Sequence, residues 1–206
     1  TLLKLMDCSF IDRTENLLID GKTGCGKSFL ACAIGRQACF MGYRVEYFSM
    51  NKFIERIALA KLDGSLLKVI NRIEKNDLVI FDEASQVHTE DAIGAIMRGK
   101  QVIIVGDTKQ LPPTSFFSTS LNDEDFDVDS DDVIDDNDAG AYESILDEAM
   151  SVLPERSLRW HYRSRHEHLI AFSNIKIYNS QLITFPSSIE SAPDCGVEYV
   201  YVKNGV

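Results

Sequence analysis

Short apolar runs alternate with longer amphipathic stretches over the first hundred residues of the chain. The runs at 16–20, 44–48, 78–81 and 101–105 have the length and apolar content of buried β-strands. The stretches between them are typical of helices and span 27–41, 51–61, 65–75 and 90–98. Strands that alternate with helices predict the α/β fold class, with a parallel sheet covered by helices on both faces.

The pattern changes after a helix that is predicted at 142–150. From Ser157 an arginine-rich, strand-like stretch begins. A further helix is predicted near 166–178, followed by strands at 182–185 and 197–202. We therefore expect one domain at 1–153 and the beginning of a second α/β unit at 154–206.

The charge of the chain is concentrated in one segment. The net charge is −11, but ten acidic residues and no basic ones fall between Asn122 and Asp138. Without these ten, 22 of the 32 acidic residues remain against 21 basic ones, so the overall charge says little about binding partners. A segment this charged cannot bury an apolar face, and we expect 122–140 to form a disordered acidic loop.

Cysteine usage and hydropathy indicate the compartment. The five cysteines are odd in number and form no CxxC pair, which favours a reduced, cytoplasmic location. Cys32 and Cys39 lie seven residues apart on a predicted helix, and we expect both to be buried as small apolar residues. No apolar run approaches the ~18 residues that a membrane-spanning helix needs, so no membrane association is predicted.

The segment 21–28 matches the phosphate-binding pattern G-x4-G-K-[ST], with a strand before it and a helix after it. Glycines at these positions let backbone N–H groups surround phosphate oxygens, and the helix N-terminus adds partial positive charge. Lys27 should reach the β- and γ-phosphates of ATP, and Ser28 should bind Mg²⁺. The residues expected to form this site are Gly21, Lys22, Thr23, Gly24, Cys25, Gly26, Lys27 and Ser28.

Two carboxylates follow the apolar run at 78–81. A parallel strand delivers its last residues to the carboxyl edge of the sheet, where ligands bind in such folds. Asp82 should therefore hold Mg²⁺ through water, and Glu83 should orient or deprotonate the attacking water. No metal other than Mg²⁺ is predicted.

Residues 10–80 resemble the transposition-helper ATPases of the IstB type, which are relatives of the DnaC helicase loader. The matching segments are NLLIDGKTGCGKSFLACAIGRQAC at 16–39, GYRVEYFS at 42–49 and LDG at 62–64. This resemblance implies an ATPase that binds DNA together with a protein partner, such as a transposase or a replicative helicase.

Residues 78–202 resemble a different family, the superfamily 1 helicases of the group that includes the nonsense-decay helicase. The matching segments are FDEASQV at 81–87, GDTKQLPP at 106–113 and LRWHYRSR at 158–165, in the order of helicase motifs II, III and IV. Both families have RecA-like P-loop NTPase folds and share the strand at 78–83, so the two halves are compatible with one sheet.

The helicase resemblance implies roles for further residues. Gln110 would sense the γ-phosphate, and Arg163 would reach the triphosphate from the second RecA-like domain. Trp160 and Tyr162 could stack on bases, but we expect them to pack in a core. The family's DNA-gripping motif after the phosphate loop is replaced here by the predicted helices at 51–75, so unwinding by this chain alone is not predicted.

Three functions remain open from the sequence. The leading hypothesis is ATP hydrolysis coupled to nucleic acid, with DNA favoured over RNA, in a superfamily 1 helicase-like ATPase. The second is a transposition-helper or helicase-loader ATPase that does not unwind. The third is a nucleotide-binding relic that has lost turnover.

Overall fold

The computed structural model describes residues 5–111, 113, 144–153, 157–186, 196–197 and 200–201. The predicted acidic loop at 122–140 lies outside these residues, as do Cys195 and half of the predicted strand at 197–202. No helix in the described ranges is both long enough and apolar enough to cross a membrane.

A five-stranded, all-parallel sheet forms the centre of the molecule, with the strand order β2-β3-β4-β1-β5. Every residue of β3 and β4 is buried, because both strands are covered on both faces. The strands are β1 (Leu17–Gly21), β2 (Val45–Ser49), β3 (Leu78–Asp82), β4 (Val102–Gly106) and β5 (Ser157–Leu158). The predicted α/β class, with its parallel sheet and helices on both faces, is confirmed.

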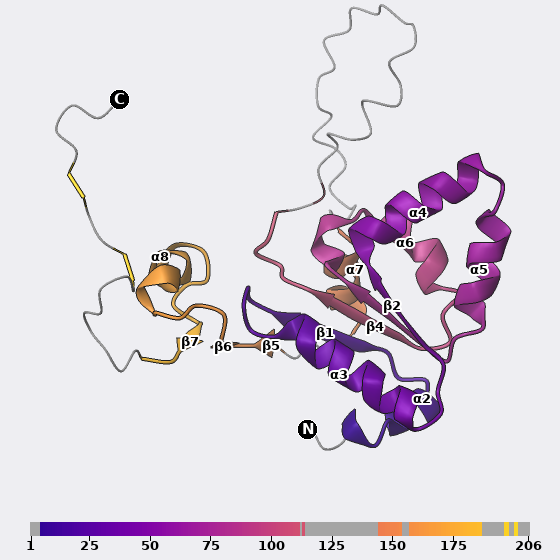
Figure 1. Ribbon diagram of the computed structural model, residues 1–206, viewed down its shortest axis with the longest axis horizontal. Coiled ribbons are helices and arrows are strands. Elements are labelled where there is room, and N and C mark those ends of the chain that lie inside the picture. The colour runs from indigo at the N-terminus through magenta and orange to yellow at the C-terminus, as the bar shows by residue number, and fades with distance from the viewer. Residues whose placement is uncertain are drawn as a thin grey trace, which may run out of the picture.

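Helices cover the two faces of the sheet in separate layers (Figure 1). On one face lie α2 (Ser9–Asp12) and α3 (Lys27–Phe40), and on the other lie the remaining helices of the first 153 residues. These are α4 (Met50–Leu62), α5 (Leu66–Glu74), α6 (Thr89–Ile96) and α7 (Ile145–Val152), with the short 3-10 helix η1 (Ala84–Gln86) after β3.

The alternation of side chains along each strand divides the core in two. Along β3, Val79 and Phe81 face the α4–α7 layer, whereas Leu78 and Ile80 face α2 and α3. The rings of Phe48, Phe53 and Phe81 pack against one another on the α4–α7 side, at centroid distances of 4.8 to 5.7 Å. Both faces of β3 are therefore held by apolar packing, which fixes the position of the residues that end the strand.

Two local predictions were wrong, and one short helix was not predicted. Cys32 and Cys39 are exposed rather than buried, because α3 packs on the sheet through Ala31, Ile34 and Ala38. The short helix α2 was not anticipated, since four residues are too few to show a helical period. The predicted helix at 142–150 begins later, at Ile145, where the Ser144 hydroxyl caps it by accepting from the Asp147 amide at 3.3 Å.

The part of the chain after residue 156 contributes to two sheets. Ser157 and Leu158 form β5, which pairs with the end of β1, so the first sheet extends past the boundary predicted at Pro154. Beyond it, β6 (Trp160–His161) and β7 (Ile183–Thr184) form a separate two-stranded parallel sheet, accompanied by α8 (His168–Lys176). That residues after β5 begin a second RecA-like domain stays a prediction.

A charged cluster lies at the edge of the sheet opposite the phosphate loop, and its contribution to stability can be tested by mutation. Asp77, just before β3, accepts from the Arg44 amide at 3.0 Å, the Arg44 guanidinium at 3.1 Å and the Lys100 ammonium at 2.9 Å. These donors hold the pKa of the Asp77 carboxyl well below its usual range, with the Arg44 side-chain hydrogen bond as the largest cause.

We predict that Asp77→Asn destabilises the fold in a pH-dependent way. A carboxylate with a lowered folded-state pKa stabilises the fold above its unfolded pKa of about 4, and this contribution is lost as the pH falls below that value. Urea unfolding of both proteins at pH 7 and pH 3 should show a smaller difference in unfolding free energy at pH 3. An equal difference at both pH values would contradict the prediction.

Candidate active site

The phosphate loop lies at the carboxyl end of β1 and leads into the helix α3. Gly21 ends β1, and Gly26 takes the left-handed conformation, with φ of 81°, immediately before α3 begins at Lys27. Strand β1 is flanked by β4 on one side and β5 on the other, so the strand order reverses here. Such a switch point, with a helix N-terminus directed at it, is where open α/β sheets bind phosphorylated ligands.

A cavity of about 280 Å³ opens at this edge of the sheet. It draws its walls from the phosphate loop, from the end of β3, from the segment after β4 and from the segment after β6. The residues that line it are Thr23, Gly24, Gly26, Lys27, Ser28, Phe29, Asp82, Glu83, Gly106, Gln110 and Arg163.

Lys27 places its ammonium group across the loop. Its Nζ donates to the carbonyl oxygen of Lys22 at 3.1 Å and lies 3.9 Å from Oδ2 of Asp107. Asp107 follows β4 and its side chain is 1% exposed, so this pair is shielded from solvent. The arrangement keeps a positive charge next to the loop amides, where an anionic ligand would be attracted.

Asp82 ends β3, Glu83 follows it, and both accept hydrogen bonds from hydroxyl groups of β2. Tyr47 donates to Oδ2 of Asp82 at 2.6 Å, and Ser49 donates to Oε2 of Glu83 at 2.6 Å. Asp82 is buried and its Oδ1 also accepts from the Glu83 amide at 2.9 Å. Burial, followed by the bond to Asp82, raises the pKa of Tyr47, so its hydroxyl remains a donor.

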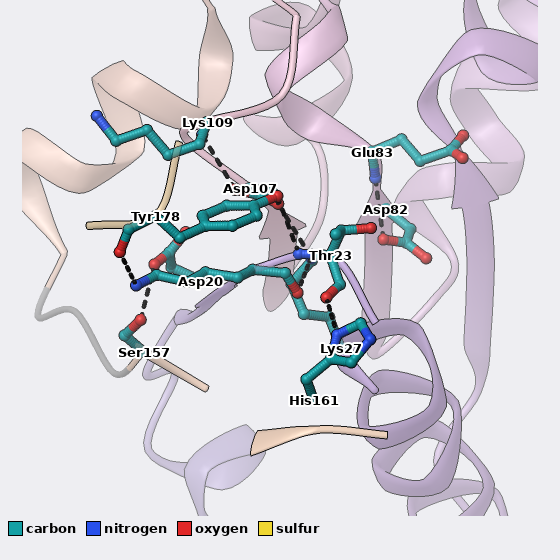
Figure 2. Close-up of polar contacts among 11 residues, drawn as sticks. Asp20, Thr23, Lys27, Asp82, Glu83, Asp107, Lys109, Ser157, His161 and Tyr178 are labelled. Atoms are coloured by element: carbon teal, nitrogen blue, oxygen red, sulfur yellow. Dashed lines mark hydrogen bonds and ion pairs between the residues drawn. The ribbon is translucent and has the colours of Figure 1, made fainter. Parts of the chain in front are cut away.

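Glu83 has an unusual backbone conformation for its position. Its φ and ψ of 65° and 35° lie in the left-handed region, which is uncommon for a residue other than glycine. The turn carries the chain from β3 into η1 and leaves the Glu83 carboxylate exposed beside buried Asp82 (Figure 2). Backbone strain of this kind concentrates at functional sites, where surrounding packing maintains it.

Three residues of the phosphate-loop segment do not line the cavity. The Lys22 ammonium donates to Oε1 of Gln181 at 2.6 Å and to the Tyr178 carbonyl oxygen at 3.3 Å. Burial lowers the pKa of Lys22. Cys25 is buried against Ile170, Tyr178 and Leu182, and Gly21 packs on Leu158. The residues that line the cavity thus include the predicted Thr23, Gly24, Gly26, Lys27 and Ser28, but not Gly21, Lys22 or Cys25.

Segment 157–186 packs directly on the phosphate loop. The Tyr162 amide donates to the Gly24 carbonyl oxygen at 2.9 Å, and Nδ1 of His161 lies 2.9 Å from the Thr23 carbonyl oxygen. Gly24 has a φ of 72°, and a Cβ there would lie 2.4 Å from the His161 ring. Glycine is therefore required at this position both by the backbone conformation and by the close approach of β6.

Tyr178 connects that segment to the loop and to β4 (Figure 2). Its buried hydroxyl donates to Oδ2 of Asp107 at 3.0 Å and accepts from the Thr23 amide at 3.3 Å. Burial is the largest cause that raises the pKa of Tyr178 to about 12. The hydroxyl joins three separate segments, since Thr23, Asp107 and Tyr178 all lie far apart in the sequence.

The sequence did not identify Tyr47, Ser49, Asp107 or Tyr178 as part of this region. For Ser49 and Asp107 a signal existed, because each is a polar residue at the carboxyl end of a predicted strand.

The expectation that Trp160 and Tyr162 pack in a core was wrong. They are 46% and 63% exposed, and both rings contact Phe185 at centroid distances of 5.1 and 5.3 Å.

The side chains at the cavity fit a magnesium ion bound together with a triphosphate. Ser28 and Asp82 offer oxygen ligands, which Mg²⁺ prefers, and Mg²⁺ usually takes its remaining ligands from phosphates and water. Within the described ranges, no group of three or more His, Cys, Asp or Glu side chains could hold a metal by itself. The cavity therefore suits a metal that arrives with a nucleotide rather than a permanently caged ion.

We predict that Tyr178→Phe destabilises the fold by about 1–3 kcal/mol, because buried Asp107 and the Thr23 amide both lose a hydrogen-bond partner. Tyr162→Phe provides the control, since that side chain is 63% exposed and should change the free energy of unfolding by less than about 0.5 kcal/mol. Urea unfolding measures both. Equal losses in the two variants, or no loss in Tyr178→Phe, would contradict the assigned contact.

Comparison with known proteins supports two relationships. Residues 1–99 match the family described as IstB-like ATP binding protein. An insertion sequence IS1162 putative ATP-binding protein of Pseudomonas fluorescens is 38% identical over 74 residues, which is 36% of this chain and 32% of the relative.

The chain is also similar to a protein named as an uncharacterized ATP-dependent helicase, the MG140 homolog of Mycoplasma pneumoniae. The two are 37% identical over 132 residues, which is 62% of this chain but only 11% of the relative. A solved structure of Pif1 helicases at forked double-stranded DNA has a TM-score of 0.53 at 20% identity, covering 88% of this chain and 48% of that one. At this identity the likeness shows the fold.

The fold, the phosphate loop and these relatives agree. The chain has a RecA-like P-loop NTPase fold; its first 99 residues match the IstB-like ATP-binding family, and it also has relatives named as ATP-dependent helicases.

Proposed function

We propose that the chain hydrolyses Mg·ATP in the cavity at the carboxyl edge of its sheet, and that this hydrolysis is coupled to nucleic acid in the manner of a superfamily 1 helicase-like ATPase. The observation that carries the proposal is the convergence of side chains from four segments on one cavity. These side chains belong to Lys27, Ser28, Asp82, Glu83, Gln110 and Arg163.

Nucleotide binding would begin at the loop. Backbone amides of the loop and the N-terminus of α3 would receive the phosphate oxygens. Lys27 would exchange its hydrogen bond with the Lys22 carbonyl for the β- and γ-phosphates, while Asp107 stays beside it. The exchange costs little, since the replaced acceptor is a neutral carbonyl and the new one is an anion.

Ser28 and Asp82 would hold the Mg²⁺ that accompanies the nucleotide. When bound, the ion supplies positive charge that neutralises the phosphates during transfer. Asp82 suits this role because it is buried, with its carboxylate oriented by hydrogen bonds to both oxygens.

Glu83 would act on the attacking water. Its carboxylate is exposed, so water reaches it, and Ser49 fixes one of its oxygens. A carboxylate in this position can orient a water molecule and accept its proton as the water oxygen bonds to the γ-phosphorus and the bond from the γ-phosphorus to the bridging oxygen of ADP breaks.

Gln110 and Arg163 would contact the γ-phosphate from opposite segments. Gln110 follows β4, and its backbone N–H donates to the carbonyl oxygen of Asp107 at 3.1 Å. This bond holds Gln110 close to Asp107, which lies beside Lys27. Arg163 is exposed and follows β6, so it is the cavity residue supplied by the C-terminal part of the chain. An arginine from a separate segment can stabilise charge that develops on the transferred phosphoryl group.

Nucleic acid is the proposed partner, with DNA favoured over RNA, and the proposed location is the cytoplasm. Arg159 and Arg165 are both exposed and would contact phosphates of the nucleic acid. A relative named as an ATP-dependent helicase supports the same partner class. The chain covers only 11% of that relative, so strand separation is not part of the function proposed for this chain.

A transposition-helper or helicase-loader ATPase is the second candidate. It is favoured by the family match over residues 1–99 and by the insertion-sequence relative. Its partner would be a transposase or a replicative helicase on duplex DNA. ATP-dependent assembly on duplex DNA with such a partner, without strand separation, would select this candidate over the first.

We predict that Lys27→Ala lowers both ATP affinity and ATP hydrolysis by at least about tenfold while the fold survives, since the variant loses the charge facing the phosphates. Lys61→Ala is the matched control, because Lys61 is exposed in the last turn of α4 and does not line the cavity. Calorimetry with ATP and a phosphate-release assay measure the two effects. Turnover near that of the parent in Lys27→Ala would refute the assigned site.

We further predict that the two carboxylates at the end of β3 separate binding from chemistry. Asp82→Asn should weaken binding of Mg·ATP, because it removes a charged metal ligand. Glu83→Gln should retain binding and lose about 10²-fold or more in single-turnover hydrolysis, which is the usual contribution of a positioned general base. The loss should fall on kcat rather than KM.

Both variants should be assayed with and without single-stranded DNA. Hydrolysis by Glu83→Gln at the parent's rate would place the base elsewhere. If the parent binds ATP tightly but releases no phosphate under either condition, the chain is a nucleotide-binding relic and the proposed hydrolysis is wrong.

A further inference from the structure

We propose that Tyr47 is a positioning residue for magnesium, which acts by holding the Asp82 carboxylate in the orientation that receives the metal. The inference rests on the proposed function, because it takes Asp82 as the residue that holds Mg²⁺. It adds a residue from β2, a strand that contributes none of the residues lining the cavity.

The strand register explains how Tyr47 reaches Asp82. In the parallel pair of β2 and β3, Tyr47 lies opposite Ile80 and Ser49 lies opposite Asp82. Tyr47 and Ser49 share one face of β2, since side chains alternate along a strand. The tyrosine is long enough to extend past its own neighbour to Asp82, which a serine or threonine at the same position would not reach.

The Asp82 carboxylate is held at both oxygens. Tyr47 donates to Oδ2 at 2.6 Å, and the Glu83 amide donates to Oδ1 at 2.9 Å. A hydroxyl that donates to a carboxylate at this distance makes a strong, charge-assisted hydrogen bond. Each carboxylate oxygen has a further lone pair, so both donors leave acceptor capacity for a metal-bound water.

The contact is suited to positioning more than to packing. Tyr47 is 42% exposed, so its ring is a minor part of the core, whereas Asp82 is 4% exposed. Removing the hydroxyl would leave the hydrogen bond at Oδ1 as the restraint on rotation of the carboxylate about the Cβ–Cγ bond, and would leave the ring in place. Partners that orient a metal ligand contribute about 10–100-fold to metal affinity in protein sites.

The experiment compares nucleotide affinity at a series of Mg²⁺ concentrations, and in EDTA, using calorimetry with a non-hydrolysable ATP analogue. The proteins are the parent, Tyr47→Phe, Asp82→Asn and a control, Tyr43→Phe. Tyr43 also donates its hydroxyl to an aspartate, Asp12, at 2.7 Å, but it lies before β2, at the end remote from the cavity. The control therefore removes the same kind of bond elsewhere.

In EDTA the affinity of Tyr47→Phe should stay within about twofold of the parent, because the phosphate loop is unchanged. The Mg²⁺ concentration that half-restores tight binding should rise by about tenfold. Tyr43→Phe should match the parent in both conditions. If Tyr47→Phe melts too early to assay, Tyr47→Leu, which suits a half-buried strand, repeats the loss of the hydroxyl.

The outcomes separate this inference from the function on which it rests. If Asp82→Asn loses the Mg²⁺ dependence but Tyr47→Phe keeps it, or binds Mg²⁺ more tightly, the role of Tyr47 is refuted and the metal assignment stands. If Asp82→Asn also keeps the parent's Mg²⁺ dependence, the metal site is elsewhere and both proposals are wrong. A loss of thermal stability in Tyr47→Phe with unchanged Mg²⁺ dependence likewise refutes the inference.

Discussion

Parallel pairing of the strands is the constraint on which the cavity depends. Since β1, β2, β3 and β4 run in one direction, their carboxyl ends meet at one edge, and the polar residues that follow them are brought together. The phosphate loop follows β1, the carboxylates end β3 and Asp107 follows β4. The apolar packing on both faces of β3 and β4 holds these strand ends in place.

The same constraint explains what could be predicted from the sequence. The run 78–81 is continuous in apolar residues and ends in two carboxylates, so both its strand conformation and the edge at which it ends could be inferred. The phosphate loop carries its own spacing of glycines, lysine and serine. The lateral order of the strands could not be inferred, because nothing local in β4 states that it inserts between β1 and β3.

Residues that act through another side chain could not be identified from the sequence either. Tyr47 is an aromatic residue in an apolar strand, and only the register with β3 places its hydroxyl beside Asp82. Tyr178 lies 155 residues from Thr23 and 71 from Asp107, and its contact with both depends on the packing of the entire segment 157–186 on the loop. Cys32 and Cys39 show the converse limit: their spacing indicated one helix face correctly but not which face meets the sheet.

The fifth strand has a consequence for dividing this chain. Strand β5 is only two residues long, yet it covers the outer edge of β1 at Asp20 and Gly21, next to the loop. A shortened protein that ended at residue 153 would leave the backbone groups of Asp20 and Gly21 on that side of β1 without their β5 partners. Open apolar edges recruit strands from other molecules. Self-association through β1 would then be the hazard of isolating the first domain, and retaining residues to Leu158 would be the simplest way to avoid it.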